Sequence, residues 1–72
     1  MNKTSLLNLL KEARRRAEAG DLDISAQHQI IIELEKNGVP SEEAQAVLAR
    51  LIETQEIDLS EMERLLDVMD RT

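Results

Sequence analysis

The sequence lacks cysteine and all three aromatic residues, and it contains only two glycines and one proline. Without cysteine the chain can form neither disulfides nor thiolate metal sites. Without phenylalanine, tyrosine or tryptophan, a core has to be built from aliphatic side chains and methionine, which bury less area each. At 72 residues the chain suits one domain, near the size at which a single core gives little net stability. Oligomerisation, or a partner that completes the core, is therefore favoured.

Long apolar segments are also missing. No run of large aliphatic side chains exceeds three residues, whereas a membrane-spanning helix needs ~20 apolar residues. The amino-terminal stretch MNKTSLLNLLKEARRR has neither the apolar segment nor the cleavage site of a signal peptide. We therefore expect a protein without membrane association, located in the cytoplasm.

The net charge of −6 is unevenly distributed along the chain. Residues 1–19 carry five basic and two acidic side chains, whereas residues 20–72 carry four basic and thirteen acidic ones. An acidic body repels nucleic acid and anionic membrane and favours a basic protein partner, unless the charge serves only as a solvated surface. A helix-turn-helix would begin its recognition helix with Ser41-Glu42-Glu43, which presents carboxylates to phosphates. Direct nucleic-acid binding is therefore not expected.

Apolar side chains recur at the i, i+3, i+4, i+7 spacing of amphipathic helices in four segments, and these core stripes include Ile30, Ile52, Leu59 and Leu66. Gly20 and Gly38 stand where left-handed residues after a helix belong, and Ser60 to Glu63 reads as a capping box. These signals predict an all-α fold with four short helices. Their approximate ranges are 4–19, 24–37, 41–56 and 60–70.

The links between these segments are short, which forces consecutive helices to pack roughly antiparallel. Segments 24–37 and 41–56 should form an αα-hairpin, closed by the turn around Gly38 and Pro40. The expected architecture is a small bundle of four short helices built around this central antiparallel hairpin, in one domain spanning 1–72. Whether the first helix packs on its own hairpin or on another chain is left open.

Candidate sites for chemistry fail on their surroundings. His28 is the only histidine, and its neighbouring helical turns offer no second ligand and no nucleophile. The stretch from Asp21 to Ser25 resembles the start of a calcium loop. However, Ala26 stands where that loop needs glycine, and Ile32 stands where it needs a bidentate glutamate. We therefore predict no catalytic residue, no cofactor and no metal site.

Three aliphatic residues lie off the centre of the apolar stripe of their own helix: Leu7, Ile32 and Val68. On a helical wheel Ile32 has His28 and Glu35 beside it rather than other apolar residues. A cluster of such side chains would form a surface for a partner or for a second copy of the chain. The sequence thus predicts Leu7, His28, Ile32, Glu35 and Val68 as partner-binding residues.

Three motifs carry a resemblance: Q-I-I-x-x-L-E-x-x-G at residues 29–38, A-x-x-x-L-x-x-L-x-x-x-Q at residues 44–55, and L-L at residues 65–66. In these the sequence resembles small helical proteins of rhizobial bacteria, and it is similar to the antiactivators of mobile symbiosis elements. That resemblance implies a protein that binds a transcriptional activator and switches off quorum-controlled conjugative transfer.

The leading hypothesis from the sequence is a non-catalytic, regulatory protein-binding module. It would act as an antiactivator that occupies the surface of a transcriptional activator. The alternative is a homo-oligomeric structural or assembly protein in which the surplus aliphatic residues seal a self-interface.

Overall fold

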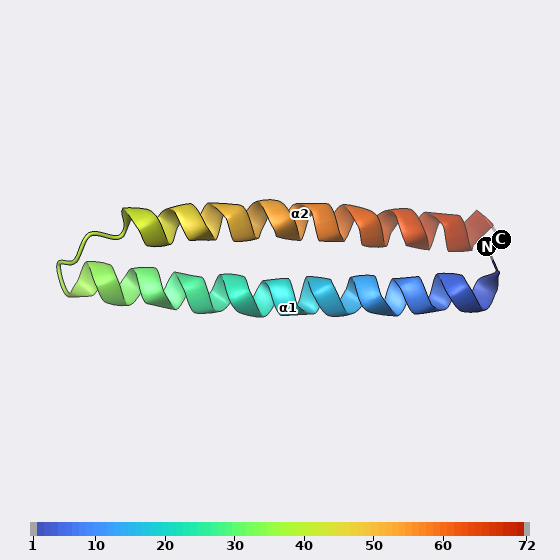
Figure 1. Cartoon of the computed structure of the whole chain (residues 1–72), viewed down its shortest axis with the longest axis horizontal. Coiled ribbons are helices and arrows are strands. Elements are labelled where there is room, and N and C mark those ends of the chain that lie inside the picture. Colours follow the sequence, from blue (N-terminus) through green and yellow to red (C-terminus); the bar gives the residue numbers. More distant parts are fainter. Residues whose placement is uncertain (1, 72) are drawn as a thin grey trace.

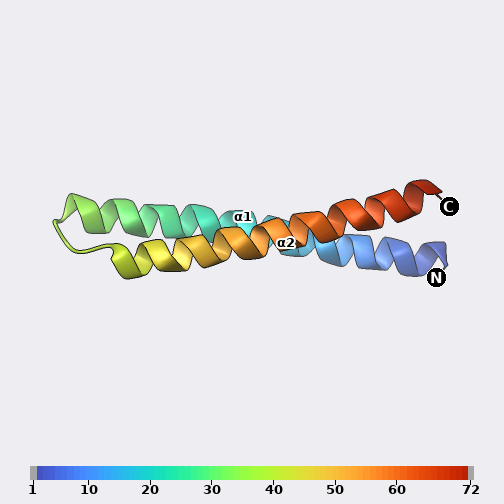
Figure 2. The same cartoon turned by 90° about the horizontal axis from the view of Figure 1, so that it is seen from above.

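A computed structural model describes residues 2–71 of the chain. It consists of two long helices, α1 (Lys3–Lys36) and α2 (Glu42–Arg71), folded back on each other as a single hairpin. The hairpin measures 54 × 14 × 13 Å, with the turn at one end and both termini at the other (Figure 1). Seen from above, the two helices cross at a shallow angle near their midpoints (Figure 2).

The all-α expectation is confirmed, but the expectation of four short helices is wrong. Gly20 lies inside α1, and among the described residues only Gly38 has a positive φ, so no left-handed break occurs at Gly20. The expected link around residues 57–59 and the capping box from Ser60 to Glu63 are both helical and lie inside α2. Local break signals of this kind cost only about 1 kcal/mol each in a helix interior, and tertiary packing can override them.

Packing overrides them here because the residues that face the other helix follow one uninterrupted spacing along the whole length of each helix. They recur at alternating spacings of three and four residues, which is the heptad spacing of a coiled coil. In the described part of α1, every residue that is not exposed belongs to this series. A break at Gly20 or near Asp58 would shift the phase and turn one half of the helix away from its partner. The series, hereafter the seam, comprises Leu6, Leu10, Ala13, Ala17, Gly20, Ile24, Gln27, Ile31 and Leu34 in α1, and Ser41, Ala44, Leu48, Leu51, Gln55, Asp58, Met62, Leu65 and Met69 in and just before α2.

The turn after α1 is the one that the sequence predicts. Gly38 has φ +69°, the left-handed conformation that glycine adopts without a Cβ penalty. Its N–H donates to the carbonyl of Glu35 at 3.1 Å, and the N–H of Val39 donates to the carbonyl of Leu34 at 2.9 Å. These two bonds form a Schellman motif, which satisfies the last carbonyls of α1 and reverses the chain.

The two helix starts lie within one or two residues of their expected positions. α1 begins after Asn2, whose Oδ1 accepts a hydrogen bond from the backbone N–H of Ser5 at 2.8 Å. α2 begins after Ser41, which is buried. The Ser41 hydroxyl donates to Glu35 Oε2 at 3.2 Å and accepts from Gln45 Nε2 at 2.8 Å, so it ties the start of α2 to the end of α1.

The core of the hairpin is thin. Only Leu6, Ala13, Ala17 and Ile31 are buried apolar residues among those described. The chain exposes 5542 Å², whereas a globular monomer of this mass exposes about 4,500 Å². Its radius of gyration is 16.4 Å, against about 11 Å for a compact domain of this length. About 1,000 Å² of surface is therefore in excess of what a compact monomer shows.

Candidate protein-binding surfaces

The middle of the seam is polar and closely spaced. Gln55 is buried there, and its Nε2 donates to the carbonyl of Ala17 at 2.8 Å and to Asp21 Oδ1 at 2.9 Å. A Cβ at Gly20 would collide with Gln55 Oε1 and lie 2.9 Å from its Cδ, so the glycine makes room for the amide. Gln55 Oε1 is buried without a hydrogen-bond partner. This tight fit allows one register of α2 on α1.

That register defines two sides of the hairpin. On one side Gln55 meets Asp21, and Glu35 meets Ser41 and Gln45. On the other side the Arg16 guanidinium lies 3.9 Å from an oxygen of Asp58. In an antiparallel coiled coil the positions that flank the seam face their equivalents across the two helices, so each side carries one flanking row from each helix.

The first side carries an apolar row on α2. Ile52, Leu59 and Leu66 recur at intervals of seven residues, directly beside the seam, and each keeps at least 40% of its surface exposed. Extending the register places Leu7 of α1, which is 44% exposed, level with Leu66. We call Ile52, Leu59 and Leu66 the Leu59 row. The sequence assigns these three residues to the core, whereas in the structure they are exposed beside the seam. Their seven-residue interval, one position after the seam residues Leu51, Asp58 and Leu65, is the signal that distinguishes them from core residues.

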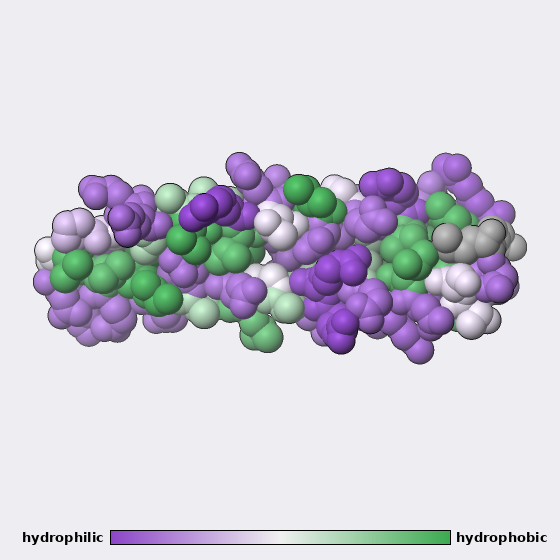
Figure 3. Space-filling view, viewed as in Figure 1, coloured by the Kyte–Doolittle hydropathy of each residue, from purple (hydrophilic) through white to green (hydrophobic). Residues whose placement is uncertain are grey.

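The second side carries apolar residues in separate places. Ile30 is half exposed near the turn, while Leu9 and Val68 are exposed near the termini. Polar residues, including Arg16, Asp23 and Glu61, occupy the flanking positions between them. Figure 3 shows one face of the hairpin on which apolar surface is likewise divided, with one patch over the turn half and another toward the termini.

A hollow of about 310 Å³ lies in the turn half, along α1. Its walls are almost wholly apolar and come from Ile30 and Leu34, with Gln29, Glu33 and Asn37 at its margin. The sequence assigns Ile30 to the core, but in the structure its neighbour Ile31 is buried and Ile30 is 49% exposed. We call Ile30, the hollow and the nearby exposed Val39 the turn-end surface.

The five residues predicted to bind a partner are all exposed, but they do not lie together. His28, Ile32 and Glu35 share one stretch of α1 near the turn, while Leu7 and Val68 lie at the end where the termini meet. Leu7 and Ile32 are separated by about 37 Å along α1. Glu35 also bonds Ser41 and Gln45, so its carboxylate helps to hold the turn. Any contact that these residues make with a partner stays a prediction.

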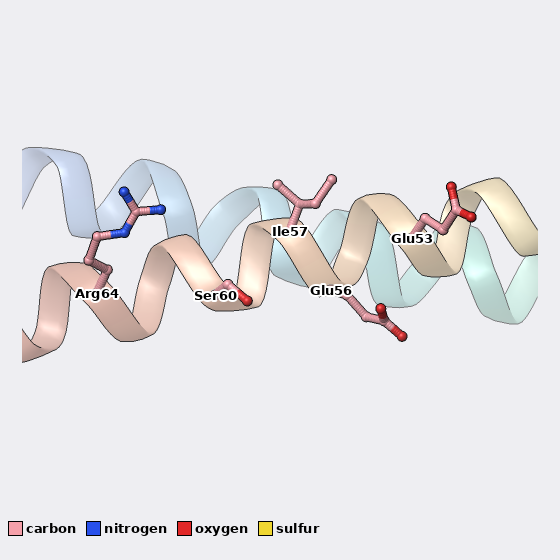
Figure 4. A pocket seen from close by; sticks show the side chains of 5 residues that line it. All are labelled: Glu53, Glu56, Ile57, Ser60 and Arg64. Atoms are coloured by element: carbon pink, nitrogen blue, oxygen red, sulfur yellow. The ribbon is translucent and has the colours of Figure 1, made fainter.

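A second hollow, of about 550 Å³, runs along the outer side of α2 and is open to solvent. Figure 4 shows its five lining residues, all from α2, with side chains that point in different directions rather than toward a common point. Catalysis requires groups that converge on one reacting atom. This hollow has no such arrangement, so we treat it as a groove of the helix surface. The lining residues are Glu53, Glu56, Ile57, Ser60 and Arg64.

Within residues 2–71 no group of three histidine or acidic side chains lies close enough together to hold a metal ion. Neither described helix has an apolar stretch long enough to cross a membrane. Searches against family models, curated proteins and solved structures returned no match. The class that the described geometry defines is architectural: an antiparallel two-helix hairpin with coiled-coil packing and exposed aliphatic residues beside its seam.

Proposed function

We propose that this chain is a non-catalytic regulatory protein of the cytoplasm that binds another protein through its turn-end surface. The proposed partner is a transcriptional activator, which the chain inhibits by occupying part of its surface. The observation that carries the proposal is the apolar hollow lined by Ile30 and Leu34. Ile30 is half exposed there, although its neighbour Ile31 is buried. The resemblance of residues 29–38 and 44–55 to antiactivators supplies the class of partner.

The turn-end surface suits insertion of a partner's side chain. Its apolar walls would bury an aliphatic or aromatic group, and such anchors dominate the energetics of protein interfaces. Gln29 and Asn37 at the margin offer amide groups for hydrogen bonds, and Glu33 offers a carboxylate. The acidic body of the chain adds attraction for a basic partner, which raises the rate of encounter.

The test is to co-purify the tagged chain from its native host and to compare two substitutions. Ile30→Asp puts a charge into the hollow, whereas Ile57→Asp puts the same charge on the outer side of α2, at a residue that is 69% exposed. We expect the wild type and Ile57→Asp to retain a transcriptional activator, and Ile30→Asp to lose it. Circular dichroism checks that both variants keep the helical content of the wild type.

A chain that retains no activator, or two variants that retain it equally, would refute the proposal. Ile32→Asp tests the predicted residue on the neighbouring side of α1, because Ile32 is not part of the hollow. If that variant binds as the wild type does, Ile32 is removed from the partner surface and the turn-end surface stands.

The second candidate is a homo-oligomeric structural or assembly protein. The Leu59 row favours it, since three aliphatic residues at heptad spacing beside an existing seam are what a further helix would pack against. Self-association and binding of an activator use different surfaces here, so one chain can do both.

A further inference from the structure

We propose that two copies of this chain associate through the side that carries the Leu59 row, and so form a four-helix bundle. In this bundle α1 of each copy lies against α2 of the other. The interface leaves the turn-end surface free, so it goes beyond the proposed function and does not depend on it.

The size of the face fits a dimer. The hairpin offers a face of 54 × 14 Å, about 760 Å², and a standard stable interface buries about 800 Å² on each partner. The surface that the chain exposes in excess of a compact monomer, about 1,000 Å², is of the same size. Burial of one face would therefore bring the exposed area of each copy down to that of an ordinary globular protein.

The apolar residues on this face are continuous with the seam. Ile52, Leu59 and Leu66 flank Gln55, Met62 and their neighbours on α2, and the register places Leu7 of α1 level with Leu66. A second hairpin laid on this side would extend the existing apolar core along α2, beside the charged Arg14 and Asp21 of α1. Four large aliphatic residues would become buried, compared with three leucines and two methionines in the seam of α2.

The area of the face and the excess exposed area select a second copy as the occupant, and charge bears on its orientation. The outer edge of this face on α2 is acidic, with Glu56, Glu63 and Asp70 at intervals of seven residues, whereas α1 brings the basic Lys11 and Arg14 together with the acidic Glu18, Asp21 and Glu35. When the twofold axis of the dimer runs parallel to the long axis of the hairpin, the start of α1 packs against the end of the partner's α2. Lys11 then lies opposite the partner's Glu63. One opposite-charge pair is thus formed, between Lys11 and the partner's Glu63, and one like-charge pair, between Glu18 and the partner's Glu56.

The other twofold arrangement is disfavoured. With the axis perpendicular to the hairpin and centred on Leu59, the acidic edge of α2 meets its own copy, so Glu56 lies opposite the partner's Glu63. Lys11 then lies opposite the partner's Glu18, and Arg14 lies opposite the partner's Arg14. The two arrangements have equal numbers of the other pairs, and the Arg14–Arg14 contact between like charges weakens the perpendicular one, so the parallel axis is preferred.

The first test is analytical ultracentrifugation of the full chain over a range of concentrations. We expect wild type to sediment at twice its monomer mass of 8.2 kDa. Leu59→Gln should sediment as a monomer at concentrations where wild type is a dimer, because it replaces an interface leucine by a polar residue that suits a helix. The matched control Ile57→Gln changes a more exposed apolar residue two positions away and should stay dimeric.

A wild type that is monomeric throughout, or two variants that dissociate equally, would overturn the proposal. Both variants should retain the activator that the turn-end surface binds. Loss of the dimer with retention of the activator therefore separates this inference from the proposed function.

A second test addresses orientation. Lys11→Glu and Glu63→Lys each place two like-charge contacts in the symmetric dimer, and each should raise the dimer Kd about tenfold. The double variant restores opposite charges across the interface and should return the Kd to near the wild-type value. A double variant that is as weak as the single variants would overturn the parallel arrangement.

Discussion

Replacement of Gly20 by alanine should destabilise the hairpin, although the same change stabilises an ordinary helix. Gly20 is in the interior of a 34-residue helix, where glycine costs about 1 kcal/mol relative to alanine. At this position, however, a Cβ collides with the buried amide of Gln55. The side chain would have to leave its place and give up its bonds to the Ala17 carbonyl and to Asp21.

The magnitude follows from these interactions. A neutral hydrogen bond contributes about 1 kcal/mol and one to a carboxylate about 2 kcal/mol, so the displaced amide loses about 3 kcal/mol. Better helix propensity returns about 1 kcal/mol. Exposure of the buried, unpaired Gln55 Oε1 to water returns about another 1 kcal/mol. The expected net loss is about 1 kcal/mol, which lowers Tm by about 5 °C for a chain of this length.

The assay is urea unfolding followed by circular dichroism, applied to a double-mutant cycle. In a Gln55→Ala background the obstruction is gone, so Gly20→Ala should stabilise by about 1 kcal/mol, and the coupling energy should be about 2 kcal/mol. Ala19→Gly is a control at the exposed neighbouring residue and should cost about 1 kcal/mol in either background. If Gly20→Ala stabilises equally with and without Gln55, the packing argument is wrong.

Two further substitutions test the ends of the hairpin. Gly38→Ala should cost about 1 kcal/mol in urea unfolding because of its φ of +69°, although nothing lies within 4 Å of the added Cβ; an unchanged midpoint would mean that the turn adopts another conformation. Leu6→Ala should lower the free energy of unfolding by about 2–4 kcal/mol, since Leu6 is buried at the end of the seam. Leu22→Ala, at the most exposed leucine, should change it by less than about 0.5 kcal/mol, and equal losses would contradict the assigned packing.

The helical class and the turn can be predicted from the sequence because their signals are local. Gly38, followed by Pro40, marks a reversal, and the spacing of apolar residues within each ten-residue stretch is helical. The number of helices cannot be predicted in this way. Gly20 has the local appearance of a helix end, and only its contact with Gln55, 35 residues later, explains a glycine inside a continuous helix. That contact is non-local, so no short window reveals it.

The candidate surfaces likewise include residues whose exposure can be predicted from the sequence and residues whose exposure cannot. Ile32 is exposed as its position on the wheel indicates, whereas Ile30, Leu59 and Leu66 are assigned to the core by stripes of helical width. A helix in a globular bundle buries a broad face, but a helix in a two-stranded hairpin buries only a narrow seam. Residues at the edges of a broad stripe are then left exposed. The error about helix number therefore also hides the Leu59 row.

The narrow seam also explains why its centre is built from small and polar residues. Ala13, Ala17 and Gly20 let α2 approach closely, and Gln55 fixes the register through directed bonds to α1. Such contacts specify one alignment but bury little apolar area, so the centre of the seam supplies little hydrophobic stabilisation. The apolar area that the seam does not supply is present instead on the surface, in the Leu59 row and at the turn end. A hairpin of this construction has its alignment set within the chain. A second copy or a partner that covers those two surfaces stabilises it further, since ligands that bind only the folded state stabilise it by mass action.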